Sequence, residues 1–369
     1  MPTVAFQNKC KASTAEPRLR LTVGTTRHID DIVSVSALEY SIYQITGQAA
    51  VTVDNSDKSW NTLFGTNTAI GGTASIGLYF PDDNETLWLF KGTVYDVRYK
   101  DAYATLIIDN KFADRLNKVV NTGTNSQERF GTVWATYDIV WDLLTTYCNL
   151  DATKDYTNPD IDYGSFTSWR DNHIIKNNYR LSVFFHRENV RDILDYVGFL
   201  TQSYIWMNKE NKVQFAPDYV TGQTYTASNI IGIPSLLVTT RNMINSLFTR
   251  YGYLPHAPKW IGDKTVNTLA SQTIFGIYKY TEDYLRAYHW NEASALQFGT
   301  EMASNYAYPE RIVTFYTNLT GILDAPGNKI TFTHDHLGAS GDTMYITDIS
   351  IHLVPGSREV CQITARWPW

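Results

Sequence analysis

Three groups of side chains have types and spacings that could do chemistry, and the first is the cluster His334-Asp335-His336. On a strand the two histidines would share one face while Asp335 points to the other, and the sequence places no third ligand for a zinc ion. Short motifs of this kind often arise by chance. We therefore interpret the cluster as a turn that follows a strand over residues 329–333.

Paired carboxylates form the second group, in which Asp54 with Asp57 and Asp82 with Asp83 could act as the acid and base of a glycosidase. Such mechanisms need carboxyl groups about 5 Å or about 6.5–9.5 Å apart, which a sequence does not define. Asp is also an ordinary residue of turns and strand ends, so we favour that interpretation. The chain contains no Gly-x-Ser-x-Gly elbow, phosphate loop or dinucleotide fingerprint.

Cysteines form the third group. Cys10, Cys148 and Cys361 lie far apart in the chain, without a Cys-x-x-Cys pair. This spacing suggests neither a zinc site nor a disulfide framework, so we expect free, partly buried thiols. Together, the three groups predict a protein that uses no metal and no cofactor and is not an enzyme.

Composition favours strands and argues against nucleic-acid binding. Of the 369 residues 14% are aromatic and only 18% are charged, and aromatic side chains suit half-buried strands and subunit interfaces alike. The net charge is −6 with no basic run, so we expect no stable nucleic-acid binding. No apolar run approaches the ~18 residues of a membrane span, and no secretory signal is visible. We expect synthesis in a cytoplasm.

The elements that must position these groups divide into three predicted domains. Alternating strands over residues 19–55, a meander of hairpins over residues 74–99 and a strand over residues 104–108 predict an N-terminal β-barrel-like domain, residues 1–125. The strand over residues 49–53 resembles the one over residues 104–108, and each is followed by Asp-Asn.

Helical spacing of apolar residues then marks an α/β domain, residues 126–217. It contains a helix around residues 139–147, a polar loop over residues 151–168 and an amphipathic helix over residues 187–200. A hairpin over residues 204–215 follows the second helix. Strands and one helix, residues 291–307, predict a C-terminal β-barrel-like domain, residues 218–369.

This order of elements resembles the tail hub (baseplate hub) proteins of tailed bacteriophages, over nearly the whole chain. The resemblance rests on the order and spacing of these stretches: Val53-Asp54-Asn55-Ser56-Asp57, Leu89-Phe90-Lys91-Gly92-Thr93-Val94, Leu106-Ile107-Ile108-Asp109-Asn110 with Leu116, the helices around Ile139–Leu144 and Val190–Leu200, the hairpin Ile205-Trp206-Met207-Asn208 to Val213-Gln214-Phe215, and the helix Ala293–Ala307 followed by Pro309.

The resemblance implies a mainly β (α+β) fold, with two antiparallel β-barrel-like domains and an α/β insertion between them. It also implies a structural virion protein that is made in the host bacterial cytoplasm and located at the phage tail tip. Three copies would form a homotrimeric ring that joins the tail tube to a spike or fibres and lets DNA pass. The implied partners are other copies of the chain, the distal tail or tail tube protein, a spike or fibre protein and the tape measure protein.

Aromatic residues are the candidates for contacts in such a ring. We name Trp88, Tyr95, Trp206 and Trp367 as interface candidates. Two alternatives stay open. The first is a receptor- or carbohydrate-binding tail tip protein, in which aromatic pairs such as Tyr204 with Trp206 stack on sugars. The second is a cell-wall or polysaccharide hydrolase.

Overall fold

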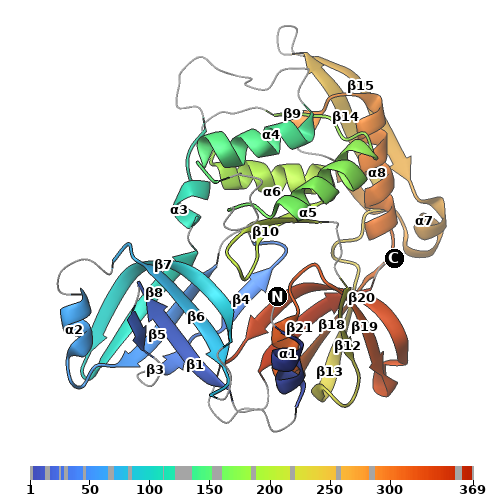
Figure 1. Cartoon of the computed structure of the whole chain (residues 1–369). Coiled ribbons are helices and arrows are strands. Elements are labelled where there is room, and N and C mark those ends of the chain that lie inside the picture. Colours follow the sequence, from blue (N-terminus) through green and yellow to red (C-terminus); the bar gives the residue numbers. More distant parts are fainter. Residues whose placement is uncertain are drawn as a thin grey trace.

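Two β units lie side by side in the computed structural model, and a third unit of helices and strands lies against both (Figure 1). We call them the N-terminal sheet, the C-terminal sheet and the α/β unit. The structure describes residues 3–12, 17–24, 26–28, 32–44, 47–64, 70–81, 85–110, 112–120, 135–151, 160–183, 188–216, 221–254, 259–281, 287–353 and 360–367.

The N-terminal sheet is a nearly closed antiparallel barrel with the strand order β2-β1-β6-β7-β8-β5-β3. Its strands are β1 (Arg18–Val23), β2 (Thr26–His28), β3 (Ile32–Val35), β5 (Gln48–Asp54), β6 (Thr73–Tyr79), β7 (Thr86–Lys100) and β8 (Tyr103–Asn110). The two similar strands noted in the sequence, β5 and β8, are direct neighbours, with Val51 opposite Leu106. Alternate residues of both strands are buried in the barrel because successive side chains on a strand point to opposite faces.

The C-terminal sheet is mixed, with the order β12-β19-β20-β21-β18-β13. Its strands are β12 (Thr221–Tyr225), β13 (Ile230–Thr239), β18 (Glu310–Thr317), β19 (Lys329–His334), β20 (Ala339–Ile351) and β21 (Cys361–Arg366). Strand β12 pairs parallel with β19, where the sequence predicted antiparallel strands only. A strand from the N-terminal segment, β4 (Leu38–Ser41), joins this sheet by pairing with β20. One continuous hydrophobic core therefore serves both sheets.

The α/β unit has a hydrophobic core of its own. Its first part contains α3 (Ala113–Leu116), α4 (Thr136–Asp142), the π-helix η1 (Leu143–Tyr147), α5 (Tyr163–Trp169), the π-helix η2 (Arg170–Ile175), β9 (Leu181–Val183), α6 (Val190–Leu200), β10 (Tyr204–Met207) and β11 (Val213–Ala216). Its second part contains β14 (Ser246–Leu254), β15 (Lys259–Asn267), α7 (Leu269–Phe275), β16 (Lys279–Thr281), β17 (Ala287–His289) and α8 (Glu292–Tyr306). Strand β9 of the first part pairs with β17 of the second, which joins the two parts.

The structure confirms the predicted fold class: the chain is mainly β, with two β units and a helical insertion between them in the chain. The polar loop predicted over residues 151–168 is wrong over residues 163–168, where α5 forms, and its residues 152–159 lie outside the described part of the chain. Asp162 caps this helix by accepting a hydrogen bond from the Ser165 amide at 3.0 Å, and Phe166 and Trp169 are buried beneath it. The division into three domains stays a prediction, and β4 and α8 make contacts across its boundaries.

Candidate assembly surfaces and the junction between the sheets

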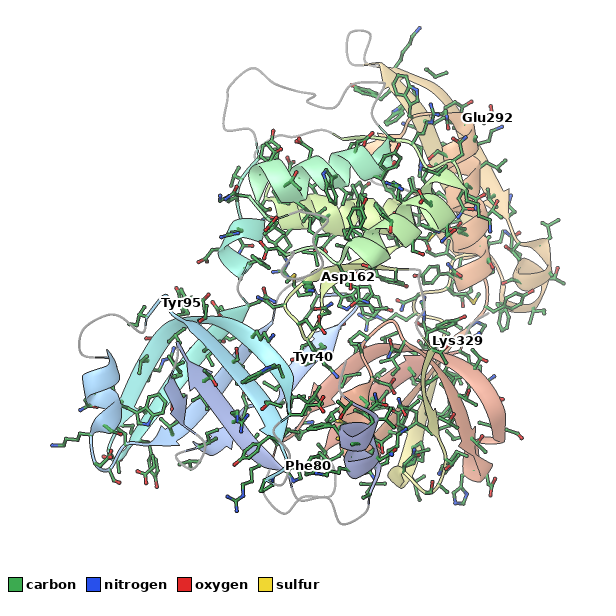
Figure 2. All side chains as sticks on the ribbon, viewed as in Figure 1. Tyr40, Phe80, Tyr95, Asp162, Glu292 and Lys329 are labelled. Atoms are coloured by element: carbon green, nitrogen blue, oxygen red, sulfur yellow. The ribbon has the colours of Figure 1, made fainter. Side chains whose placement is uncertain are left out.

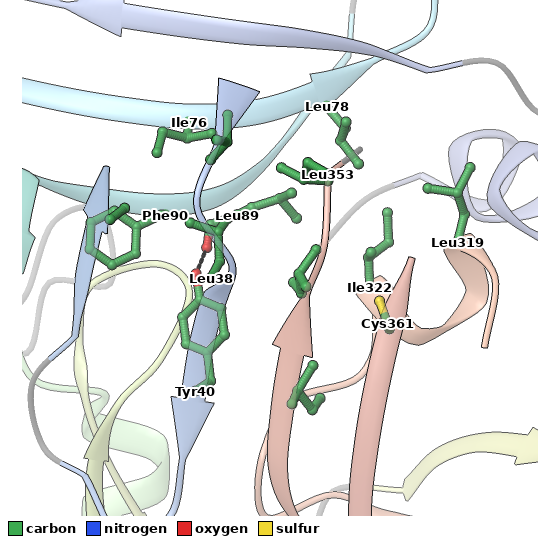
Figure 3. Packing of buried hydrophobic residues seen from close by; sticks show 14 of the residues in the cluster. Leu38, Tyr40, Ile76, Leu78, Leu89, Phe90, Leu319, Ile322, Leu353 and Cys361 are labelled. Atoms are coloured by element: carbon green, nitrogen blue, oxygen red, sulfur yellow. Dashed lines mark hydrogen bonds between the residues drawn. The ribbon is translucent and has the colours of Figure 1, made fainter. Parts of the chain in front are cut away.

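Strand β4 connects the two sheets through side chains as well as backbone (Figure 3). Its Leu38 and Tyr40 are buried, and the Tyr40 hydroxyl donates a hydrogen bond to the carbonyl of Leu89 on β7. On the opposite side β4 pairs with β20, where Leu38 lies opposite Ile351. A single short strand therefore holds the N-terminal sheet against the C-terminal sheet.

Helix α1 (Val4–Lys11) lies near the junction, in front of the C-terminal sheet in the view of Figure 1. Thr3 caps the helix by accepting a hydrogen bond from the Phe6 amide. Phe6 is fully buried, with its ring 5.1 Å from that of Phe80, which follows β6. Helix α1 also contacts the 3-10 helix η3 (Leu319–Leu323), which follows β18 of the C-terminal sheet. The helix thus adds apolar contacts to both sides of the junction.

Lys209 connects the α/β unit to this junction. It lies in the turn between β10 and β11, and its ammonium group donates hydrogen bonds to the carbonyls of Ile322, at 2.7 Å, and Asp324. The same group lies 5.9 Å from the centre of the Tyr40 ring. Burial lowers the pKa of Lys209 to about 8. Because a buried charge must have polar partners, these carbonyls fix where the turn docks.

Asp324 organises a buried polar network beside Lys209. Its carboxylate accepts hydrogen bonds from the Tyr225 hydroxyl at 2.5 Å, the Asn328 amide at 3.0 Å and the Gln223 backbone at 3.1 Å. Burial raises the pKa of Asp324. These groups are fully engaged with one another, and a neighbouring cavity lined by Tyr40, Lys209 and others has a volume of only about 20 Å³. That is room for about one water.

The groups that the sequence offered for chemistry serve as turn residues. His334 ends β19, and Asp335 begins the 3-10 turn η4 (Asp335–Leu337), which confirms the turn interpretation. Asp54 and Asp57 accept hydrogen bonds at 2.9 Å from the amides of Ser56 and Ser59, as turn carboxylates do. Asp82 and Asp83 lie outside the described residues.

Within the described ranges, no three His, Cys, Asp or Glu residues are placed to hold a metal ion. The helices in that part of the chain are too short or too polar to cross a membrane. Cys10, Cys148 and Cys361 are free and almost completely buried. Burial raises the pKa of each thiol to about 12, so these cysteines are protonated and unreactive at neutral pH.

Two of the four interface candidates lie in the interior of the chain. Trp206 is 1% exposed. Gly327 packs so closely against it that a Cβ atom added to Gly327 would lie 3.0 Å from the Trp206 ring. Trp367 is 8% exposed, with its indole N–H donating to Asp342 at 2.8 Å and Arg311 4.3 Å above its ring. Little of either side chain remains for contact with another subunit or a sugar.

The other two candidates, Trp88 and Tyr95, lie on β7. Figure 2 shows Tyr95 at the top of the N-terminal sheet. Trp88 is half-buried, whereas Tyr95 is 64% exposed. The register of β7 against β8 shifts between Val94 and Asp96, which makes Tyr95 the extra residue of a bulge. Bulges redirect a side chain relative to the regular strand, and here the redirected side chain is a tyrosine suited to contacts. Two more exposed tyrosines, Tyr99 and Tyr103, lie near the end of the same hairpin.

Two groups of exposed apolar residues were missed in the sequence. Four large apolar residues of β13 are exposed, and so are Leu269, Ile274 and Ile277 in and beside α7. The available signal was the lack of charge in both stretches, residues 230–240 and 269–278. Composition of this kind is equally typical of a core strand or helix, so it could not reveal exposure.

Comparison with solved structures places the fold in the class of phage tail proteins, along nearly the full chain. The 43 kDa tail protein of prophage MuSo2 from Shewanella oneidensis matches with a TM-score of 0.60 at 11% identity, covering 96% of this chain and 99% of that one. A tail protein from Neisseria meningitidis MC58 matches with a TM-score of 0.59 at 10% identity, covering 95% and 96%. Prophage tail protein gp18 from Listeria monocytogenes EGD-e matches with a TM-score of 0.52 at 9% identity, covering 95% and 94%.

These matches confirm the predicted resemblance at the level of the fold. No protein-family model matches the sequence, and no curated protein matches it either.

Proposed function

We propose that this chain is a structural subunit of a phage tail, a tail hub that forms a closed threefold ring at the tail tip. The observation that carries the proposal is the shared fold, which covers 96% of this chain and 99% of a prophage tail protein. In the ring, each copy contributes two β units. The tail tube or distal tail protein contacts one face and a spike or fibre protein the other, while the tape measure protein and then the DNA occupy the channel.

The junction between the sheets supports this function physically. A ring of identical copies closes only if every copy holds the same angle between the surfaces that contact its two neighbours. In this chain β4 and α1 fix the N-terminal sheet relative to the C-terminal sheet, and Lys209 fixes the α/β unit to their junction. A subunit with a loose junction would form mixtures of open and closed assemblies.

Charge supports a channel through which DNA moves without being held. Each Lys or Arg that neutralises a phosphate adds affinity through counterion release, so a basic lumen would slow transit. The chain instead carries a net charge of −6. We propose a role in assembly and DNA passage without catalysis, with the protein located at the tail tip of the virion.

The test combines light scattering with gel retardation of duplex DNA. The purified chain should have the mass of three copies, or should be present in three copies in the complex that it forms with its tail proteins. It should leave duplex DNA unretarded at about 0.15 M salt, where charges act over only ~8 Å. A single-copy mass under every condition would contradict the ring. Tight DNA binding at that salt would contradict the passive channel.

A second candidate function, glycan binding at the tail tip, is favoured by the exposed tyrosines Tyr95, Tyr99 and Tyr103. Their rings combine an apolar face with a polar edge, as sugar-binding aromatics do. A glycan array with the wild type and with Tyr99→Ala tests this candidate. Binding that the substitution abolishes would support it, and an array without binding would remove it.

A further inference from the structure

Strand β13 is the last strand on its side of the C-terminal sheet. One of its edges pairs antiparallel with β18, where Leu236 lies opposite Val313 and Val238 opposite Arg311. No strand in the described part of the chain pairs with its other edge. A free edge presents a row of backbone donors and acceptors that fit another strand.

Four apolar side chains of β13 are exposed, and they lie on both faces of the sheet. Ile233 is 78% exposed, Leu236 39%, Leu237 55% and Val238 56%. Leu237 and Val238 are adjacent, so they point to opposite faces of the sheet. Single exposed apolar residues are common on proteins, but four within one ten-residue strand form a patch of the kind that marks an interaction site.

The second half of β13 lacks the features that protect an isolated edge. Such edges usually carry charges, prolines or bulges that prevent pairing with other chains. Pro234 and a shift in register between Ile231 and Ser235 occupy the first half of β13. Residues 235–239 pair regularly with β18, and residues 230–240 contain no charge.

A second copy of this chain is the occupant that fits these features. An uncharged apolar strand matches the interfaces of permanent homo-oligomers, in which charges are depleted at the centre. Strand addition already occurs within the chain, since β4 from the N-terminal segment pairs with β20 of the C-terminal sheet. The same mode between copies requires a free edge on the C-terminal sheet, and β13 provides one.

We propose that β13 is the strand by which one copy joins the next, its free edge pairing with a sheet of the neighbouring copy. This inference rests on the proposed ring. In a closed ring the contact is heterologous, so β13 of each copy meets a different surface of its neighbour. Leu237 and Val238 are buried on the two faces of the extended sheet.

Leu237→Lys and Val238→Lys test the proposal, because each adds a charge to the exposed strand without altering the interior. Light scattering should show that each variant has one third of the wild-type mass, with a circular dichroism spectrum like that of the wild type. The matched controls are Ile175→Lys and Leu296→Lys, which replace apolar residues of similar exposure, 53% and 48%, on the α/β unit. Both controls should keep the wild-type mass.

A photo-crosslinking side chain at position 237 gives a second measurement. In the wild-type background it should produce links between copies, which mass spectrometry maps to one segment of the neighbour. If crosslinks form only within one chain, the proposal that β13 contacts a neighbouring copy is wrong.

The outcomes separate this inference from the proposed function. A wild type that remains a single copy would overturn both. A ring that persists in Leu237→Lys and Val238→Lys would overturn the role of β13 and leave the ring intact. If these variants keep the ring but lose the binding of another tail protein, that protein covers β13 and the proposed contact between copies is wrong.

Discussion

Lys209 is the side chain at which the three units of the chain meet, and its charge makes the junction sensitive to pH. Burial lowers its pKa from 10.5 to about 8. At pH values between about 8 and 10.5, Lys209 therefore binds more protons in the unfolded chain than in the folded chain. The contribution of Lys209 to the free energy of unfolding therefore rises as the pH increases from about 8 to 10.5.

This pH dependence gives a prediction for the variant Lys209→Met. The free energy of unfolding of the wild type minus that of the variant should increase between pH 8 and pH 10, by up to about 3 kcal/mol. Denaturant titrations at both pH values measure it, and Lys100→Met reports the effect of losing one exposed positive charge. A difference that stays flat or falls would contradict a buried, charged Lys209.

Ile193 gives a prediction for the interior of the α/β unit. The side chain is 1% exposed at the centre of α6 and shares a core with Ile205 and Phe215 of the hairpin β10–β11. Ile193→Asp would bury a carboxylate without a partner and should lower the free energy of unfolding by about 3–5 kcal/mol. Ile175→Asp, at a site that is 53% exposed, should cost less than about 1 kcal/mol. Similar losses in both variants would contradict the placement of α6.

Single residues also show where prediction from the sequence ends. Turn chemistry is local, so the roles of Asp54 and Asp57 were predictable. The exposure of an aromatic residue depends on what the rest of the fold brings against it. Trp206 and Tyr95 look equally suited to an interface in the sequence, yet one is 1% exposed and the other 64%.

At the scale of elements, helices with a strong apolar face were predicted well. Helix α6 has Val190, Ile193, Leu194 and Val197 on one face, and its predicted range and the observed one differ mainly at the N-terminus, where Asn189 is the cap. Helix α5 was missed because Pro159, Gly164 and the many Asp and Asn residues of this stretch are typical of a loop. The pairing of β4 with β20 joins segments about three hundred residues apart and has no local signal.

Helix α8 yields a prediction about how the α/β unit holds together. Its Glu301 accepts hydrogen bonds from the Tyr179 hydroxyl at 2.7 Å and the Asn177 amide at 3.0 Å, both far away in the chain. Glu301→Ala should therefore lower the free energy of unfolding by about 2 kcal/mol, since hydrogen bonds to charged groups are the stronger ones. The neighbouring Thr300 is exposed and bonds only to its own helix, at the Leu296 carbonyl, so Thr300→Ala should change little. Denaturant titration of both variants measures the difference. Equal losses of stability in the two variants would argue against a stabilising role for the hydrogen bonds that Glu301 accepts from Tyr179 and Asn177.

At the scale of the whole molecule, the fold should hold without a metal ion. The described residues contain no candidate metal cluster, β4 and α1 hold the two sheets together, and Lys209 holds the α/β unit to their junction. Incubation with a chelator should therefore leave the melting temperature unchanged. A fall of several degrees, with stoichiometric zinc or calcium found by elemental analysis, would show that a structural ion is present.

The central claim is that copies of this chain close into a ring, and cryo-electron microscopy of the purified full chain tests it most directly. Class averages should show a closed ring with threefold symmetry and six lobes, two from each copy, around an open channel. Averages that show only single copies, even with the other tail proteins present, would contradict the claim, and so would open chains of copies that never close.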